Sequence, residues 1–195
     1  MQRLRIYLTG VGGQGTLTAT SLFSRIALDA GLEVVSGEIH GMAQRGGVVE
    51  STILLGGWQS PSIYHGQADI ILGFEALETY RALPYLTNDG AIFSSTDFVP
   101  PPGVSMGRES LPPFATIEET VRANAKTVVF LSLKDIGAQC GNIQSGNSAL
   151  LAALCASGLT PINVDALKQG IAKYLPAKVV EANLKAVDLG AAAAR

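Results

Sequence analysis

The segment that most constrains the fold is the glycine-rich run over residues 10–15, which directly follows the apolar residues 4–8. Glycine adopts backbone conformations that other residues avoid, so glycines at this spacing allow a strand to turn sharply into a helix. The first turn of that helix has backbone N–H groups without intrahelical partners and a partial positive charge. The sequence therefore predicts a strand, a tight loop and a helix whose N-terminus is open to an anion or to a polar group of a partner.

A second glycine-rich loop spans residues 40–47 and follows the next expected strand. Its polar members are His40, Gln44 and Arg45. Arg45 could bind an anionic group through two parallel hydrogen bonds, and His40 could accept or donate a proton near neutral pH. The alternative interpretation is that these side chains hold the loop to its own backbone or lie in an interface.

The apolar pattern along the chain predicts alternating strands and helices. Strands are expected over residues 4–9, 33–38, 48–55, 68–74, 91–95 and 127–131. Helices are expected over residues 16–30, 75–86, 117–125, 147–157, 164–174 and 178–189. Such alternation is typical of an α/β fold with a mostly parallel sheet. The third strand follows the second without a helix between them, so it either pairs antiparallel or reaches the sheet after a longer path.

The expected fold is a single-domain, three-layer α/β sandwich over residues 1–195 with a mostly parallel, Rossmann-like sheet. A chain of 195 residues suits one well-buried domain and is rather short for two. Prolines cluster in residues 97–113. Because proline cannot donate a backbone hydrogen bond, this stretch is expected to be an exposed, extended connection, and Asp89-Gly90 is expected to be a turn.

In a parallel α/β sheet, the crevice used for binding lies beyond the carboxyl ends of the strands. Both glycine loops are expected there, together with Phe74-Glu75 at the end of the fourth strand. The candidate site residues are Gly10, Gly12, Gly13, Gln14, Gly15, Glu38, His40, Gly41, Gln44, Arg45, Gly46 and Gly47. They are expected to contact a ligand or another subunit, and none is predicted to be catalytic or to bind a metal.

The composition favours a chain that buries a large surface against partners. Hydrophobic residues make up 47% of the chain and charged residues only 15%, against about 25% in an average soluble protein. The alternative is a small domain with an unusually large core. A net charge of −2 argues against nucleic-acid binding, which favours a basic surface. The apolar runs are shorter than the roughly 20 residues that a membrane helix needs.

Cysteine usage also limits what the chain can bind. Its only cysteines are Cys140 and Cys155, whereas an iron–sulfur cluster commonly has four cysteine ligands. A disulfide between them is not expected in a cytoplasmic protein. Residues 1–5 lead directly into a strand and do not resemble a signal peptide, so a cytoplasmic location is expected.

The pattern of Gly10, Gly12 and Gly15 also matches the dinucleotide-binding fingerprint, with Glu38 placed as the acid that would bind a ribose. This pattern leaves open a freestanding NAD(P)- or flavin-dependent reductase and a non-enzymatic nucleotide-binding module. The polar Gln14 within the loop argues against a dinucleotide, since cofactor-binding loops usually have small residues there. His65 is expected to face solvent, and Gly146-Asn147-Ser148 is expected to begin a helix.

The two glycine loops together resemble the gamma-type subunit or domain of 2-oxoacid:ferredoxin oxidoreductases. The matching segments are Gly-Val-Gly-Gly-Gln-Gly over residues 10–15 and Glu-Ile-His-Gly-Met-Ala-Gln-Arg-Gly-Gly over residues 38–47. The resemblance extends to residues 68–78, 146–147 and 178–183. The segment before Arg-Gly-Gly favours the aryl-pyruvate branch, in which this domain is the small beta subunit of indolepyruvate:ferredoxin oxidoreductase. Val48 departs slightly from the pattern, in which small polar residues are common.

This resemblance implies a complex that oxidatively decarboxylates an aryl 2-oxoacid to its acyl-CoA and passes electrons to ferredoxin. It implies that thiamine diphosphate, magnesium and the iron–sulfur clusters belong to a large partner subunit, and that this chain binds none of them alone. Coenzyme A would be a substrate of the complex. The family gives no residue of this domain a chemical role, so its glycine loops are expected to contact the large subunit or coenzyme A phosphates. Self-association is a further expectation.

Overall fold

The computed structural model describes residues 3–40, 47–108 and 110–194 of the chain. The described residues form one six-stranded sheet in the order β2-β3-β1-β4-β5-β6. The strands are β1 (Leu4–Val11), β2 (Val34–His40), β3 (Val48–Leu55), β4 (Ala68–Gly73), β5 (Leu86–Ser95) and β6 (Thr127–Leu131). Only β3 runs antiparallel to its neighbours β1 and β2, and the pairs from β1 to β6 are parallel. The structure confirms the mostly parallel sheet, and of the two alternatives for the third strand it shows the antiparallel one.

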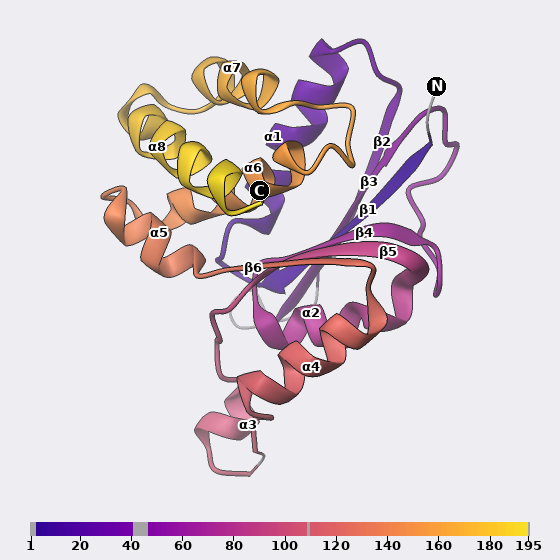
Figure 1. Ribbon diagram of the computed structural model, residues 1–195, viewed down its shortest axis with the longest axis vertical. Coiled ribbons are helices and arrows are strands. Elements are labelled where there is room, and N and C mark those ends of the chain that lie inside the picture. The colour runs from indigo at the N-terminus through magenta and orange to yellow at the C-terminus, as the bar shows by residue number, and fades with distance from the viewer. Residues whose placement is uncertain (1–2, 41–46, 109, 195) are drawn as a thin grey trace.

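Helices cover both faces of this sheet, which confirms the three-layer α/β sandwich (Figure 1). The first helical layer is formed by α1 (Thr16–Asp29), α5 (Leu133–Gln139), α6 (Gly146–Ala156), α7 (Val164–Tyr174) and α8 (Ala177–Ala193). The second contains α2 (Ala76–Ala82) and α4 (Phe114–Asn124), with the short α3 (Pro102–Ser105) beyond them. Two 3-10 turns, Leu83–Tyr85 and Ile143–Ser145, complete the described elements.

Each layer has its own apolar core, because successive side chains of a strand point to opposite faces of the sheet. Ile6 and Leu8 of β1 pack with α1, α6, α7 and α8, whereas Tyr7 packs on the side of α2 and α4. The α6 segment is buried along almost its full length. This helix therefore forms the centre of its layer, covered by α8 on its outer side.

Local sequence signals explain how several of these elements end. Helix α1 ends at Asp29, and Gly31 follows in a left-handed conformation with φ of 75°, as expected of a glycine that stops a helix. Helix α7 begins after Asn163, whose side chain accepts a hydrogen bond from the backbone N–H of Ala166 at 2.8 Å. These caps are local, and the predicted bounds of these helices agree with the structure within a residue.

The prediction of a turn at Asp89-Gly90 is wrong, because both residues lie inside β5. This strand begins at Leu86, earlier than the predicted residue 91. The register of β5 against β4 shifts between the pairs Ala68–Leu86 and Ile70–Ala91, so the intervening residues of β5 form an irregular, partly exposed segment. The turn-forming residues therefore distort a strand and do not end it.

Residues 97–113 are mostly irregular, as predicted, but they also contain the short helix α3. Proline is tolerated in the first turn of a helix, where its missing N–H has no intrahelical partner to lose. Helix α5 is not predicted from the sequence. It is short, and Ser132 caps it by accepting a hydrogen bond from the backbone N–H of Asp135 at 3.3 Å.

Candidate functional site at the carboxyl edge of the sheet

The first glycine loop connects β1 to α1 through two residues in the left-handed conformation, Gly13 with φ of 97° and Gly15 with φ of 88°. Side chains other than glycine rarely adopt such angles. Gly10 is required for a different reason: a Cβ there would lie 2.8 Å from the hydroxyl of Thr16 and 3.1 Å from the Cβ of Phe74. The glycine pattern thus allows both the turn and the close packing of the loop on the end of β4.

The two glycine loops meet at one edge of the sheet. The backbone N–H of Gly12 donates to the carbonyl of Gly47 at 2.8 Å. The antiparallel pairing of β1 and β3 continues to Val11 and Val48, and His40 at the end of β2 pairs with Val49. The predicted meeting of the loop ends at one edge is confirmed.

Residues 41–46 of the second loop lie outside the described residues, as does the side chain of His40, and they include the candidate site residues Gly41, Gln44, Arg45 and Gly46. The roles assigned to them from the sequence stay predictions.

Gln14 holds the first loop together. Its carboxamide oxygen accepts a hydrogen bond from the backbone N–H of Val11 at 2.7 Å, and its own backbone N–H donates to the Val11 carbonyl at 3.1 Å. The side chain therefore folds back onto the loop.

Asn147, in the first turn of α6, fastens the loop to the helical layer. Its side-chain nitrogen donates to the carbonyl of Gln14 at 2.7 Å. A Cβ on Gly15 would lie 2.8 Å from the same nitrogen, so Gly15 allows this close approach. From the sequence, Asn147 is expected only as part of a helix start. Its position in the motif Gly146-Asn147, which the family resemblance includes, is the signal that could have identified it.

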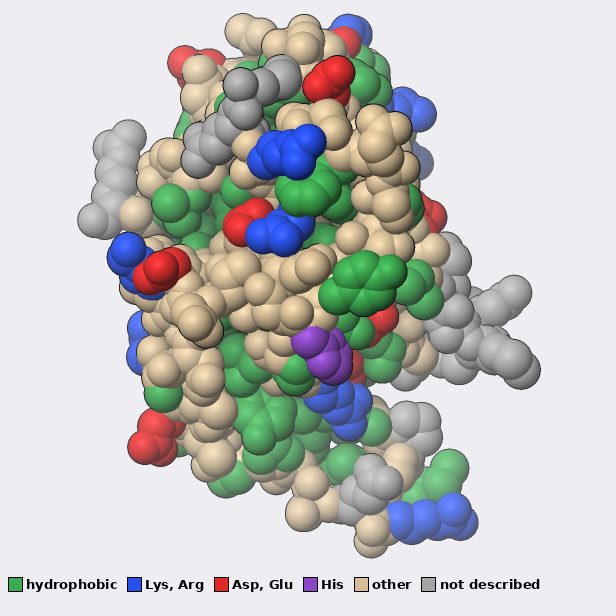
Figure 2. All heavy atoms as spheres, turned by 90° about the vertical axis from the view of Figure 1, so that its right-hand side faces the viewer, with side chains coloured by type: hydrophobic (Ala, Val, Ile, Leu, Met, Phe, Trp, Pro, Cys, Tyr) green, Lys and Arg blue, Asp and Glu red, His purple; other side chains and the backbone are tan. Residues whose placement is uncertain are grey.

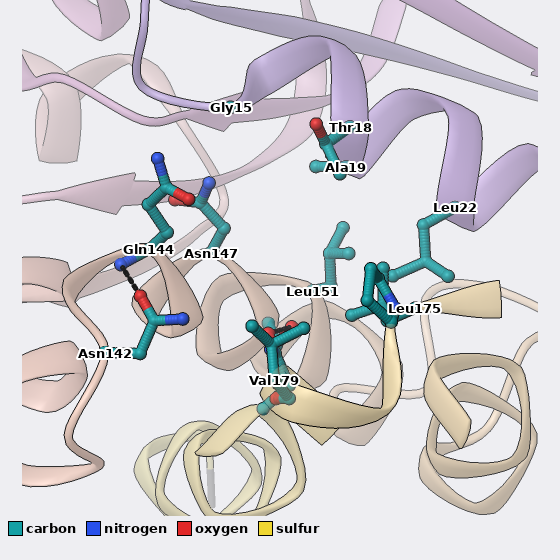
Figure 3. A pocket seen from close by; sticks show the side chains of 13 residues that line it. Gly15, Thr18, Ala19, Leu22, Asn142, Gln144, Asn147, Leu151, Leu175 and Val179 are labelled. Carbon is teal, nitrogen blue, oxygen red and sulfur yellow. Dashed lines mark hydrogen bonds between the residues drawn. The ribbon is translucent and has the colours of Figure 1, made fainter. Parts of the chain in front are cut away.

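A pocket of about 260 Å³ opens beside Gly15 and Asn147, between α1, α6 and the start of α8 (Figure 3). Its apolar surface includes Ala19, Leu22 and Leu151. Its polar groups are the side chains of Thr18, Asn142, Gln144, Asn147, Ser148 and Asn183. Every one of these polar groups is neutral, so the pocket suits a hydrogen-bonding ligand without a strong charge requirement.

The deepest polar groups of this pocket are paired with each other. The Ser148 hydroxyl donates to the side-chain oxygen of Asn183 at 2.7 Å, and the Asn183 nitrogen donates to the carbonyl of Val179 at 2.7 Å. Helix α1, whose N-terminus adjoins the pocket, has no side-chain cap at Gly15. Its first-turn N–H groups thus add a partial positive charge at the pocket entrance.

The sheet order argues against the dinucleotide interpretation of Glu38. In the Rossmann fold that binds dinucleotides, the strand that carries the ribose-binding acid lies next to the first strand. Here β3 lies between β1 and β2, and Glu38 is on β2. At about 4.8 Å per strand, Glu38 is displaced by roughly one further strand spacing from the first glycine loop.

Glu75, at the end of β4, is wholly buried and has a structural role. One carboxylate oxygen accepts from the backbone N–H of Glu78 at 2.8 Å, and the other accepts from that of Val99 at 3.0 Å. Burial raises the pKa of Glu75, and the hydrogen bonds partly oppose this effect. The side chain caps α2 and joins it to the connection after β5.

Cys140 and Cys155 are free thiols, and burial raises the pKa of Cys155 to about 12. Across the described residues, no three or more His, Cys, Asp or Glu side chains are grouped as a metal site would require. The same residues include no helix with the length and apolar character needed to cross a bilayer. Charged groups are scattered among polar and hydrophobic ones on the face shown in Figure 2.

Known proteins resemble this chain over its full length. Residues 5–193 match the sequence pattern of the family described as pyruvate ferredoxin/flavodoxin oxidoreductase. The indolepyruvate oxidoreductase subunit IorB of Pyrococcus horikoshii is 37% identical over 198 residues, which covers 100% of this chain and 98% of that protein.

Two solved structures share the fold. The gamma subunit of a keto/oxoacid ferredoxin oxidoreductase from Geobacter sulfurreducens superimposes with a TM-score of 0.71 at 23% identity and covers 98% of both chains. The 2-oxoglutarate:ferredoxin oxidoreductase of Magnetococcus marinus gives a TM-score of 0.72 at 18% identity, with 100% of this chain matched to 31% of that one. In that larger chain, the fold is therefore one part of a longer polypeptide.

The whole-length match, the gamma-subunit fold and the two glycine loops joined at the edge of the sheet lead to the same assignment. The chain belongs to the pyruvate ferredoxin/flavodoxin oxidoreductase family.

Proposed function

We propose that this chain is the small subunit of an indolepyruvate-type 2-oxoacid:ferredoxin oxidoreductase. The observation that carries the proposal is the 37% identity to an indolepyruvate oxidoreductase subunit along the entire chain. The complex would oxidatively decarboxylate an aryl 2-oxoacid to its acyl-CoA and transfer the electrons to ferredoxin. Thiamine diphosphate, magnesium and iron–sulfur clusters would be held by a large partner subunit, and the complex would work in the cytoplasm.

Within this complex, the carboxyl edge of the sheet would contact the large subunit or coenzyme A. Gly12 and Gly13 present bare backbone there, and the uncapped N-terminus of α1 favours an anionic group such as a phosphate. The neutral amides of the adjoining pocket suit a ligand that contains amide groups. The Magnetococcus marinus structure was determined with coenzyme A and succinyl-CoA bound, which supports a coenzyme A role for this family.

The chain's own residues would position and shield the reaction without performing it. The described edge presents backbone N–H groups, carboxamides and hydroxyls, and its buried carboxylate Glu75 is occupied by two backbone N–H groups. We therefore expect the isolated chain to be inactive.

The test is to purify the chain alone and together with its large subunit, and to measure reduction of a viologen dye with indolepyruvate and coenzyme A. Only the complex should reduce the dye, and omission of coenzyme A should stop turnover. Turnover by the isolated chain would contradict the proposal. Saturable binding of NADH or a flavin to the isolated chain would instead favour a freestanding reductase, and tight binding of an adenine nucleotide without turnover would favour a nucleotide-binding module.

A further inference from the structure

Another cavity lies on the opposite face of the sheet from the pocket beside Gly15, where β2 and β3 are covered by the loop over residues 56–67. Pro61 packs closely on β2, because a Cβ on Gly37 would lie only 2.7 Å from the Cβ of Pro61. The Thr52 hydroxyl of β3 donates to the Pro61 carbonyl at 2.7 Å. The Trp58 side chain donates to the Leu55 carbonyl at 3.0 Å, so the loop is anchored on both strands.

This loop and the sheet enclose a cavity of about 330 Å³, within the range of small-molecule binding sites. Tyr7 of β1 and Tyr85 form one side of it, with their rings stacked at 4.4 Å between centroids and an interplanar angle of 18°. Pro61, Ile63 and the exposed Tyr64 contribute further apolar surface. The cavity therefore has flat, mostly apolar walls.

Among the described residues, polar groups in this cavity lack the internal pairing found in the pocket beside Gly15, and they include the buried hydroxyls of Tyr7 and Ser51. The Tyr7 side chain is 3% exposed, yet its hydroxyl has no hydrogen-bond partner in the described part of the chain. A buried hydroxyl without a partner is unfavourable, and such groups often indicate a missing ligand or water. Glu50 of β3 also lines the cavity, and none of the ion pairs among the described residues includes it.

The described lining of the cavity includes two carboxyl residues, Glu38 and Glu50. Burial raises the pKa of Tyr7, and the nearby Glu50 carboxylate raises it further. The buried Glu78 is also close enough to interact with Glu50, although Glu78 has its own ion pair with Arg81 at 2.7 Å. The described lining includes no lysine or arginine. An anionic ligand would be repelled here, and a cation would be attracted.

We propose that this cavity binds a small organic ammonium ion with a flat apolar or aromatic body. The ammonium group would pair with the Glu50 carboxylate and donate to the Tyr7 hydroxyl. The apolar body would lie against Tyr85 and Tyr64, where ring faces also favour a nearby positive charge. This cavity adjoins the glycine-loop edge, since Glu38 lines it and Glu50 pairs with Thr9 of β1. Its test measures binding to the isolated chain and so does not depend on the function proposed above.

The test uses isothermal titration calorimetry of the full chain with 2-phenylethylammonium as the probe. Two analogues with the same aromatic ring serve as comparisons. In 2-phenylethanol a neutral hydroxyl stands in place of the ammonium group, and in phenylacetate an anionic carboxylate does. The ammonium probe should bind at one site, the alcohol should bind at least about tenfold more weakly, and phenylacetate should not bind. Equal binding of the alcohol, or no saturable binding of the ammonium probe up to about 10 mM, would overturn the proposal.

Variants locate the binding within the cavity. Glu50→Gln should weaken the ammonium probe about tenfold, and Tyr7→Phe should weaken it about threefold. Tyr64→Ala removes an exposed side chain from the wall of the cavity. Because this change should not impair folding, it tests binding even if a variant of a buried residue fails to fold. Glu119→Gln is the matched control, because it removes the same charge from the exposed surface of α4. Unchanged affinity in both Glu50→Gln and Tyr64→Ala would place binding elsewhere and refute the proposal.

Discussion

Two pockets of this protein, one beside Gly15 and one beside Glu50, lie on opposite faces of the sheet and differ in how their buried polar groups are paired. In the pocket beside Gly15, Ser148 and Asn183 bond to each other and to the backbone of α8. In the cavity beside Glu50, the buried Tyr7 hydroxyl has no partner among the described residues. A paired polar group stabilises the protein by itself, whereas an unpaired one costs stability until a ligand or water binds it. Hydrogen-bond pairing therefore distinguishes buried polar groups that stabilise the fold from buried polar groups that can bind a ligand.

The two faces also differ in how closely the chain packs. A Cβ on Gly190 of α8 would lie within 2.0 Å of the Ala149 carbonyl of α6, and one on Gly146 would lie within 2.0 Å of the Leu133 carbonyl. On the opposite face, a Cβ on Gly66 would meet nothing within 4 Å. The helical layer beside Gly15 is thus packed backbone against backbone. The loop that covers the cavity beside Glu50 instead packs on β2 through the Pro61 side chain and leaves room around Gly66.

The largest effect is expected from Gly190→Ala, because the new methyl group would meet backbone atoms that cannot move aside. The free energy of unfolding should fall by about 3 kcal/mol, measured by urea denaturation. Gly66→Ala is the comparison on the other face. It places a side chain at φ of 73° without a clash and should cost about 1 kcal/mol. Equal losses for the two variants would show that the faces do not differ in packing.

Asn147→Ala tests whether the helical layer positions the first glycine loop. Loss of the bond to the Gln14 carbonyl should lower the free energy of unfolding by about 1 kcal/mol. It should also raise the KM of the complex for coenzyme A, because the loop at the pocket entrance is no longer held. Asn124→Ala is the matched control, since Asn124 makes the same type of bond to the Thr120 carbonyl on α4 at 2.8 Å. If both variants changed KM alike, the loop would have no special role.

The buried carboxyl group of Glu78 should make the stability of the protein depend on pH, whereas the uncharged side chains of the pocket beside Gly15 should not. Burial raises the pKa of Glu78 above its ordinary value of about 4.3. Between that value and the raised folded pKa, the unfolded chain releases the proton first and so binds fewer protons than the folded chain. The free energy of unfolding contributed by Glu78 therefore falls as pH rises through this window.

Glu78→Gln should remove this contribution, so the stability of the variant relative to the unmodified protein should rise from about pH 4 upward. Melting temperatures measured at intervals across this range provide the test. Glu119→Gln, which removes an exposed carboxyl on the same side of the sheet, is the surface control. A difference between Glu78→Gln and the unmodified protein that does not change with pH would mean that burial does not shift the pKa of Glu78.

The smallest effect is expected from Tyr7→Phe. Removal of a buried hydroxyl without a partner should leave the free energy of unfolding unchanged or raise it by up to about 1 kcal/mol. Ser148→Ala on the other face removes a bonded hydroxyl and leaves the Asn183 oxygen without its donor, so it should cost about 1–2 kcal/mol. Thermal unfolding of the two variants compares them directly. A clear loss of stability in Tyr7→Phe would mean that the hydroxyl is already paired in solution.

Much of the fold follows from local sequence patterns. The bounds predicted for residues 48–55, 127–131 and 164–174 agree with β3, β6 and α7, because apolar periodicity and capping residues act within a few positions. The errors occur where distant contacts dominate. Asp89-Gly90 has the local preference of a turn, but the pairing of β5 with β4 keeps the chain in the strand.

The candidate site was predicted only in part. The glycine loops could be placed at one edge because strand ends in a parallel sheet share an edge. Asn147 reaches the first loop from far along the chain, and no local pattern indicates that contact. The cavity beside Glu50 also depends on contacts between distant residues, because Pro61 packs over Gly37 and Tyr85 stacks on Tyr7.

By itself, the sequence determined an α/β chain with two glycine turns at the ends of strands, because backbone freedom and side-chain periodicity are properties of neighbouring residues. Only the tertiary structure decided that β3 lies between β1 and β2 and that the two faces of the sheet carry pockets of opposite character. Strand order and the pairing of buried polar groups depend on contacts between residues far apart in the chain, and these contacts form only in the folded protein.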